Sequence, residues 1–177
     1  MSMIFREATA TDAAGLLVHL RAVGGETDNL SYSADTFQIS EEREVKFIDR
    51  FARSKTDVMF VAIDGERVVG NAIVERNRIS RYNHRAEISI TVLKEYWGRG
   101  IGSRLMELMI EFAEKTGIEI LYLEVRADNR RAIALYEKYG FEVIGTYKNF
   151  FKIGNNYYDA ILMNKNLKNP EFFLKTP

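Results

Sequence analysis

Hydrophobic residues in the first part of the chain change their spacing from one segment to the next. The pattern from Met3 to Ala8 predicts a strand, and apolar residues at helical spacing from position 13 onward predict a helix behind it. Gly24 and Gly25 are expected to end this helix, because two adjacent glycines weaken a helical pattern. The polar stretch 26–36 is then expected to be a loop.

A tight hairpin is the clearest strand signal in the sequence. The apolar runs 58–63 and 68–74 flank Asp64-Gly65, a dipeptide that favours the two-residue turn between antiparallel strands. Before this hairpin, Ser40 is expected to cap a second helix, whose acidic first turn complements the helix dipole.

Two further glycines mark the ends of later helices. Gly117 and Gly140 each follow an amphipathic stretch, where a left-handed residue commonly closes a helix. The remaining elements are predicted at 86–93 (strand), 101–116 (helix), 118–125 (strand), 129–139 (helix), and 141–151 with 157–163 (a final hairpin). The order β-α-α-β-β-β-α-β-α-β-β predicts one α/β domain over residues 1–167, with a mixed parallel and antiparallel sheet flanked by helices, and a tail at 168–177.

Composition narrows the classes of function. Twenty-five basic residues balance twenty-five acidic ones among the 177, so neither nucleic acid nor a membrane surface is expected as a partner. The absence of cysteine excludes disulfides and a cysteine nucleophile, and it suits a reducing cytoplasm. Because His19 and His84 are the only histidines, no metal site is expected. Neither a signal peptide nor a membrane span is expected, since no apolar run reaches about 20 residues.

A glycine-rich stretch between a predicted strand and a predicted helix is the main candidate for chemistry. Gly98, Gly100 and Gly102 stand at alternate positions, and glycine lets backbone N–H groups approach a ligand closely. Together with the N-terminus of the next helix, such a loop can cradle a pyrophosphate; a glycine turn without a ligand is the alternative. The basic residues that could add charge are Lys94, Arg99 and Arg104.

Two common phosphate-binding motifs do not fit this loop. Gly102 is followed by Ser103-Arg104 rather than by the Lys-Ser/Thr of a P-loop. The third glycine of a dinucleotide fingerprint is missing, because Ser103 or Leu105 occupies its position. Glu124 lies about 20 residues further on, where a ribose-binding acid would stand. A dinucleotide such as NAD therefore remains an alternative ligand.

The loop resembles motif A of the GNAT superfamily of N-acetyltransferases, Arg/Gln-x-x-Gly-x-Gly/Ala. Gly100 and Gly102 match its glycine positions, and Trp97 stands in place of the Arg or Gln. Segment 129–141 resembles motif B, Asn-x-x-Ala-x-x-Leu-Tyr-x-x-x-Gly-Phe, at every specified position. The likeness extends from residue 4 to 167, and it is most similar in wording to the bacterial ribosomal-protein alanine acetyltransferases.

This resemblance implies acetyl-CoA as the cofactor and Tyr136 as a residue near its sulfur. A phenol there could protonate the departing thiolate, although a core aromatic is the alternative role for Tyr136. Glu124 and Glu87 are candidates for the base that deprotonates the amine, and a chain of waters is equally compatible. A free strand N–H near Val92 could stabilise the developing oxyanion. The implied coenzyme-binding residues are Ile90, Thr91, Val92, Gly98, Arg99, Gly100, Ile101, Gly102, Ser103 and Asn129.

The acetyl acceptor is expected to be a small-molecule amine or a peptide N-terminus. It would be held by the loop between the first two helices and by the last hairpin. The candidate acceptor-binding residues are Glu26, Asp28, Tyr32, Tyr147, Phe150, Phe151, Tyr157 and Tyr158. Two other functions stay open at this point, a coenzyme A-binding sensor or assembly domain without turnover and a dinucleotide-binding protein. A homodimer also stays open.

Overall fold

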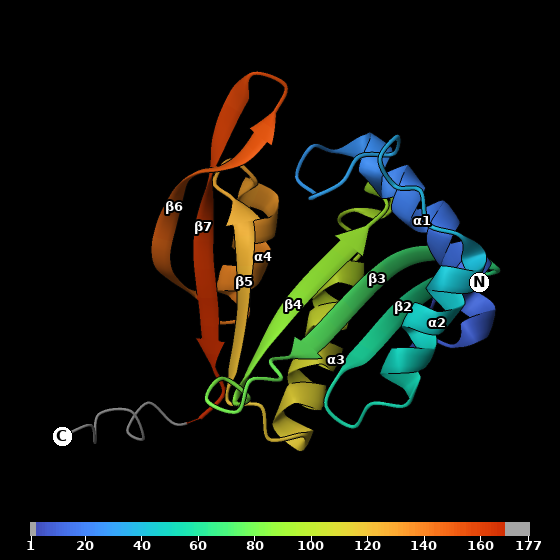
Figure 1. Ribbon diagram of the computed structural model, residues 1–177, viewed down its shortest axis with the longest axis horizontal. Coiled ribbons are helices and arrows are strands. Elements are labelled where there is room, and N and C mark those ends of the chain that lie inside the picture. Colours follow the sequence, from blue (N-terminus) through green and yellow to red (C-terminus); the bar gives the residue numbers. More distant parts are fainter. Residues whose placement is uncertain (1–2, 169–177) are drawn as a thin grey trace.

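One seven-stranded sheet forms the centre of the protein, in the spatial order β1-β2-β3-β4-β5-β7-β6 (Figure 1). The computed structural model describes residues 3–168, so the predicted tail lies outside the described residues except for Lys168. The strands are β1 (Ile4–Glu7), β2 (Val58–Asp64), β3 (Arg67–Arg76), β4 (Arg85–Val92), β5 (Ile120–Arg126), β6 (Glu142–Ile153) and β7 (Asn156–Asn166). Among these described strands only the β4–β5 pair is parallel, and the mixed sheet expected from the sequence is confirmed.

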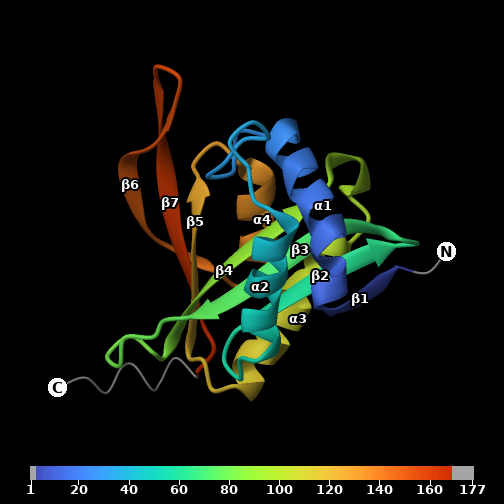
Figure 2. The ribbon, with the colours of Figure 1, turned by 45° about the vertical axis from the view of Figure 1, so that its right-hand side comes forward.

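In the part of the chain that the structure describes, four α-helices cover the two faces of this sheet. They are α1 (Ala13–Glu26), α2 (Glu41–Ala52), α3 (Ile101–Lys115) and α4 (Arg130–Lys138). Helices α1 and α2 lie on one face, and α3 and α4 lie on the other (Figure 2). Two buried clusters hold these layers together. The larger one joins α3 to β2–β5 through side chains such as Leu105, Met106 and Leu121, and the smaller one joins α1 and α2 to β2 through Leu16, Ile48 and Val61.

The predicted end of the first helix is wrong, since α1 continues through Gly24 and Gly25 to Glu26. The reason is packing. Gly24 is buried, and a Cβ on it would lie 3.0 Å from the backbone nitrogen of Ala34 and 3.1 Å from the ring of Tyr32. Glycine at this position therefore lets the α1–α2 loop fold back onto the helix instead of breaking it.

The pairing of β4 with β5 is short, and it leaves the two strands unpaired with each other toward their carboxyl ends. It joins Arg85 to Ile120, Ala86 to Leu121 and Glu87 to Tyr122, and goes no further. Beyond Glu87, β4 stays paired with β3 on one side only, while β5 stays paired with β7. The two strands therefore diverge toward their carboxyl ends, as the gap between them in Figure 1 shows.

The two glycines of α1 provide a matched test of this packing. We expect Gly25→Ala to raise the melting temperature slightly, because Gly25 is exposed, its Cβ would lie 3.6 Å from Ala34, and alanine favours a helix by about 1 kcal/mol. We expect Gly24→Ala to lower it, because the new methyl group meets backbone at 3.0 Å. Thermal unfolding followed by circular dichroism measures both, and equal melting temperatures would contradict the packing argument.

Candidate active site

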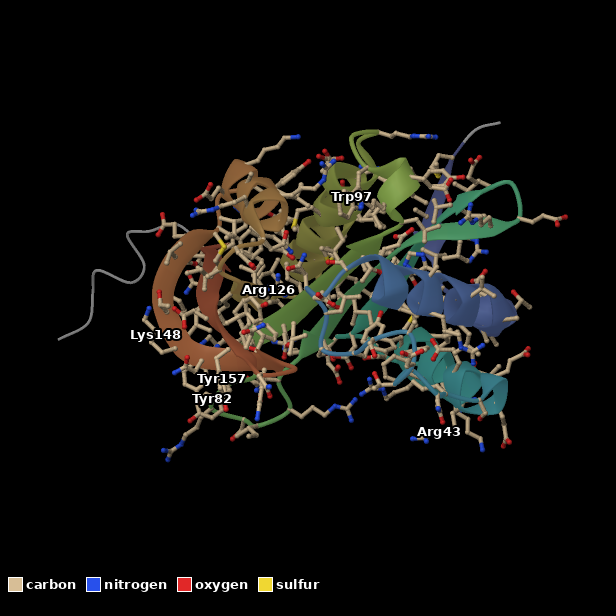
Figure 3. The ribbon with its side chains drawn as sticks, turned by 90° about the horizontal axis from the view of Figure 1, so that it is seen from above. Arg43, Tyr82, Trp97, Arg126, Lys148 and Tyr157 are labelled. Carbon is tan, nitrogen blue, oxygen red and sulfur yellow. The ribbon has the colours of Figure 1, made fainter. Side chains whose placement is uncertain are left out.

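A cleft of about 760 Å³ fills the space between the diverging strands. Its walls come from the α1–α2 loop, β4, the glycine loop and the start of α3, β5, α4 and the middle of β6. Figure 3 looks down on this region, with Trp97 on the side of the glycine loop and Arg126 on the side of the last hairpin. The cleft thus collects residues from the whole length of the domain.

The backbone of β4 presents one unpaired edge to the cleft. In an antiparallel pair, successive residues point their N–H groups to opposite edges of the strand. The N–H of Leu93 donates to the carbonyl of Val69 at 3.0 Å, so the N–H of Val92 faces the cleft. The Val92 carbonyl accepts from the indole Nε1 of Trp97 at 2.8 Å. Val92 therefore offers its N–H as a hydrogen-bond donor along this edge, and the predicted residue Ile90 lines the same wall.

Thr91 lies between these two residues and points its side chain to the other face of the sheet. Its hydroxyl is 2.8 Å from Nε2 of the buried His19 in α1. Burial lowers the pKa of His19 to about 4, so the imidazole is neutral at physiological pH. The pair ties α1 to β4 directly behind the cleft.

The glycine loop has the conformation of an anion cradle. Gly98 and Gly100 have φ angles of 78° and 81°, a left-handed region that residues with a Cβ rarely adopt. Gly100 is also the N-cap of α3, so the positive end of the helix dipole faces the loop. A Cβ on Gly102 would lie 3.2 Å from Leu135 of α4. Together with Ile101 and Ser103, these glycines line the cleft, and the donor set fits the pyrophosphate of coenzyme A.

The basic residues predicted to assist this loop are not part of the cleft lining. Arg99 stacks on Tyr96, with Cζ 4.7 Å from the ring centroid. Arg104 pairs with Glu107 at 3.1 Å. Lys94 starts a 3₁₀ turn outside the cleft. Arg99 and Arg104 thus already have side-chain partners, and the contact of Arg99 with the coenzyme stays a prediction.

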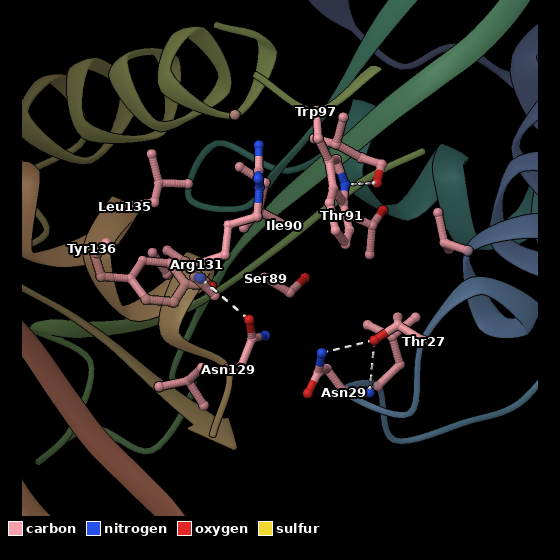
Figure 4. Close-up of a pocket in the computed structure, with 18 of the residues that line it drawn as sticks. Thr27, Asn29, Ser89, Ile90, Thr91, Trp97, Asn129, Arg131, Leu135 and Tyr136 are labelled. Carbon is pink, nitrogen blue, oxygen red and sulfur yellow. Dashed lines mark hydrogen bonds between the residues drawn. The ribbon is translucent and has the colours of Figure 1, made fainter. Parts of the chain in front are cut away.

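Helix α4 contributes both residues expected from motif B. Asn129 caps the helix by accepting from the backbone N–H of Ala132 at 3.3 Å, which leaves its amide –NH₂ group as the part that can donate to a ligand (Figure 4). Tyr136 lines the cleft, is only 7% exposed and packs 5.8 Å from the ring of Phe141. Burial raises the pKa of Tyr136 to about 12, so the phenol keeps its proton at neutral pH.

Both candidate bases line the cleft as well. Glu87 is the last residue of β4 that pairs with β5, and its partner there is Tyr122. Glu124 stands two residues after Tyr122 and therefore lies on the same face of the sheet. Desolvation raises the pKa of Glu87 above its usual range, and the negative charges of Glu124 and Glu75 raise it further. The two carboxylates are thus electrostatically coupled neighbours.

The structure sorts the predicted acceptor residues into two groups. Phe150 and Phe151 line the cleft, whereas the predicted tyrosines of the hairpin, Tyr147, Tyr157 and Tyr158, are not among the residues of its lining. At the end of α1, the Glu26 carboxylate accepts from the N–H of Lys94 at 2.8 Å, and in the loop that follows, the Asp28 carbonyl accepts from Arg126 at 3.1 Å. Tyr32 is packed 4.9 Å from Phe37. These three residues shape the loop rather than the cavity.

Asn29 is a cleft residue that the sequence analysis did not single out. Its Nδ2 donates to the hydroxyl of Thr27 at 2.7 Å, while its Oδ1 is buried without a hydrogen-bond partner among the described residues (Figure 4). A buried acceptor of this kind favours a ligand that donates a hydrogen bond. Three more cleft residues were not predicted, namely Trp97, Arg131 and Lys138. Nothing in their local spacing indicates which way their side chains face.

Between residues 3 and 168, no helix is long and apolar enough to cross a membrane. The same residues contain no group of three or more histidine, aspartate or glutamate side chains placed to hold a metal ion.

Comparison with known proteins identifies relatives of this arrangement. The model of the acetyltransferase (GNAT) family matches residues 26–141. An L-amino acid N-acetyltransferase of Escherichia coli is 33% identical over 131 residues, 73% of this chain and 80% of that protein. A ribosomal protein bS18-alanine N-acetyltransferase of the same species is 32% identical over 111 residues, 59% of this chain and 75% of that protein.

A solved structure agrees with these sequence matches. The crystal structure of a GNAT-family acetyltransferase from Streptococcus pneumoniae superposes with a TM-score of 0.90 at 31% identity, covering 94% of this chain and 100% of that one. The resemblance inferred from the two motifs is therefore confirmed, and the dinucleotide alternative loses its basis. This protein belongs to the GNAT family and is an N-acetyltransferase that uses acetyl-CoA.

Proposed function

We propose that the enzyme acetylates a primary amine by direct attack while both substrates occupy the cleft, and that the acceptor reaches the site as a cation. The observation that carries this proposal is the set of polar groups that line the same cleft as Tyr136. Glu87 and Glu124 contribute carboxylates, and Asn29 contributes a carboxamide oxygen that has no hydrogen-bond partner within residues 3–168. All three are hydrogen-bond acceptors, which suits the donors of an ammonium group.

Two acceptor classes agree with this site, a small-molecule amine and a peptide N-terminus. The relatives described above are named for an L-amino acid and for a ribosomal-protein alanine. The aromatic rings of Phe150 and Phe151, whose centroids are 4.9 Å apart, add an apolar surface for the remainder of the acceptor. The predicted homodimer and cytoplasmic location stay predictions.

Acetyl-CoA supplies a thioester carbonyl that a neutral amine can attack. The N–H of Val92 is available to donate to the carbonyl oxygen as negative charge develops on it, because its strand edge has no partner strand beyond Glu87 within residues 3–168. Tyr136 can donate its proton to the sulfur as the thiolate leaves. Because burial makes this phenol a weak acid, with a pKa of about 12, we infer a modest contribution to the rate.

The amine must lose a proton before it attacks, and we assign this step to Glu87. Desolvation raises the pKa of Glu87, which makes its carboxylate a stronger base than an ordinary glutamate, and the negative charge of Glu124 raises the pKa further. Glu124 would also hold the incoming ammonium group. Transfer through ordered water to either carboxylate is compatible with the same arrangement.

The direct test is thiol release from acetyl-CoA in the presence of a panel of amines, amino acids and peptides with free N-termini. We expect release with cationic primary amines and none with their N-acetylated forms. Tight binding of acetyl-CoA without turnover on any member of a broad panel would favour a coenzyme-binding sensor. Stabilisation by NADH but not by acetyl-CoA would contradict the cofactor assignment.

Gly100→Val tests the proposed cradle. No atom lies within 4 Å of a Cβ at this position, so the damage comes from the φ angle of 81°, which a β-branched residue avoids. We expect a loss of coenzyme A affinity of at least tenfold, measured by calorimetry. Gly117→Val is the matched control, because Gly117 has a φ of 69°, equally open space and a place outside the cleft. Equal affinities of the two variants would remove the loop from the site.

Tyr136→Phe separates proton donation from core packing. General acid catalysis is typically worth about 10²–10⁴ in rate, and we expect kcat to fall by roughly 10² with little change in acetyl-CoA affinity. Tyr139→Phe, at the C-cap of the same helix, is the control. The Tyr139 hydroxyl donates to Glu107 at 2.9 Å, and neither of these two residues lines the cleft. A phenylalanine variant of Tyr136 at full rate would assign the ring to the core alone.

The coupled carboxylates predict a pH effect with a definite sign. A base works deprotonated, so kcat/KM falls below the pKa of Glu87, and the negative charge of Glu124 raises that pKa. The fall in kcat/KM at low pH is the acid limb of the profile. We expect Glu124→Gln to shift this limb to lower pH, Glu75→Gln to shift it less, and Glu87→Gln to abolish it. Steady-state pH profiles measure all three. An unchanged limb in Glu87→Gln would exclude this residue as the base.

A further inference from the structure

Two basic side chains line the cleft, and both come from α4 rather than from the glycine loop. They are Arg131 and Lys138, and no other lysine or arginine belongs to the lining within residues 3–168. They are seven residues apart, which places them on the same side of the helix and about 10 Å apart along its axis. By contrast, Arg99 stacks on Tyr96 and Arg104 pairs with Glu107, and neither arginine belongs to the lining.

Each of these side chains lies at one end of the glycine loop. Arg131 approaches its beginning, since a Cβ on Gly98 would lie 3.9 Å from Nη2 of Arg131. Lys138 approaches its end, where Nζ donates to the hydroxyl of Ser103 at 3.1 Å. The backbone N–H groups between these two points are therefore flanked by a positive charge on either side.

Trp97 holds the first of these charges in position. Its ring lies 4.8 Å from Cζ of Arg131, within the range of a cation–π interaction, and its Nε1 is fixed by the hydrogen bond to the Val92 carbonyl (Figure 4). Trp97 thus contacts the edge of β4 through the Val92 carbonyl and α4 through Arg131. Trp97 occupies the position where motif A has Arg or Gln, so an aromatic platform stands where a polar side chain is expected.

We propose that Arg131 and Lys138 bind the phosphate groups of the coenzyme from α4, and that Trp97 is a positioning residue that orients Arg131 for this contact. The ligand chemistry is suitable, because coenzyme A carries a pyrophosphate and a separate 3′-phosphate, and guanidinium and ammonium groups form charge-assisted hydrogen bonds with phosphate oxygens. The inference rests on the coenzyme occupying this cleft and adds a source of charge that motif A does not contain.

Calorimetric binding of coenzyme A in the absence of any acceptor tests this proposal independently of turnover. We expect Arg131→Ala to weaken binding roughly ten- to hundredfold, the range typical of a lost charge-assisted hydrogen bond, and Lys138→Gln to weaken it as well. The affinity of Arg131→Ala should also depend less on salt concentration than that of the wild type. Arg130→Ala is the matched control, since Arg130 is exposed on the same helix turn but does not line the cleft.

Two further measurements separate phosphate binding from a general structural effect. Acetylpantetheine lacks all the phosphates, so its binding should be the same in the wild type and in both α4 variants. Trp97→Leu should weaken coenzyme A binding, and adding Arg131→Ala to it should cost less than Arg131→Ala alone, because the tryptophan acts through the arginine. Equal coenzyme affinity in Arg131→Ala and Arg130→Ala, or an equal loss for acetylpantetheine, would overturn the proposal.

Discussion

The short parallel contact between β4 and β5 is the constraint on which the rest of the site depends. On β4, only residues Arg85 to Glu87 pair with β5. The larger buried cluster packs α3 against this end of the sheet. Beyond Glu87 each strand follows its other neighbour, so the edge of β4 is left with backbone groups that lack a strand partner. Unpaired backbone donors beside a cavity require a ligand or water. The pantetheine arm of a coenzyme, with its amide groups, matches that requirement.

Basic and acidic side chains occupy different parts of the cleft lining. Arg131 and Lys138 stand by the glycine loop, where the phosphates of the coenzyme are expected, while Glu87 and Glu124 stand on the strands, where the amine is expected. Under the proposed function, the anionic coenzyme and the cationic acceptor would therefore be attracted to different parts of the cleft. Since the chain is neutral overall, this asymmetry is a local property that net charge does not reveal.

Local irregularities place the residues that regular strands and helices could not. The register between β6 and β7 shifts between Tyr147 and Phe151, and Asn149 there has a φ of 56°. This break accompanies the entry of Phe150 and Phe151 into the cleft. At the other wall, buried Gly24 allows the α1–α2 loop to fold over α1, which brings Asn29 to the cavity. The first feature interrupts the regular pairing of β6 with β7, and the second lowers the helix propensity of α1. Each one places residues in the part of the cleft where the acceptor is expected.

The sequence by itself determined the element order, the glycine loop and the two motifs, because period-2 and period-3.6 patterns, caps and left-handed glycines are local properties of the chain. It also proposed Tyr136, Glu87 and Glu124 as catalytic candidates, and all three line the cleft. It did not reveal the end of α1, since burial of Gly24 depends on the loop packed against it. Only the tertiary structure decided that Arg99 turns to Tyr96 while Arg131 turns to Trp97. The direction of a long, flexible side chain is set by partners distant in sequence, and no local pattern encodes it.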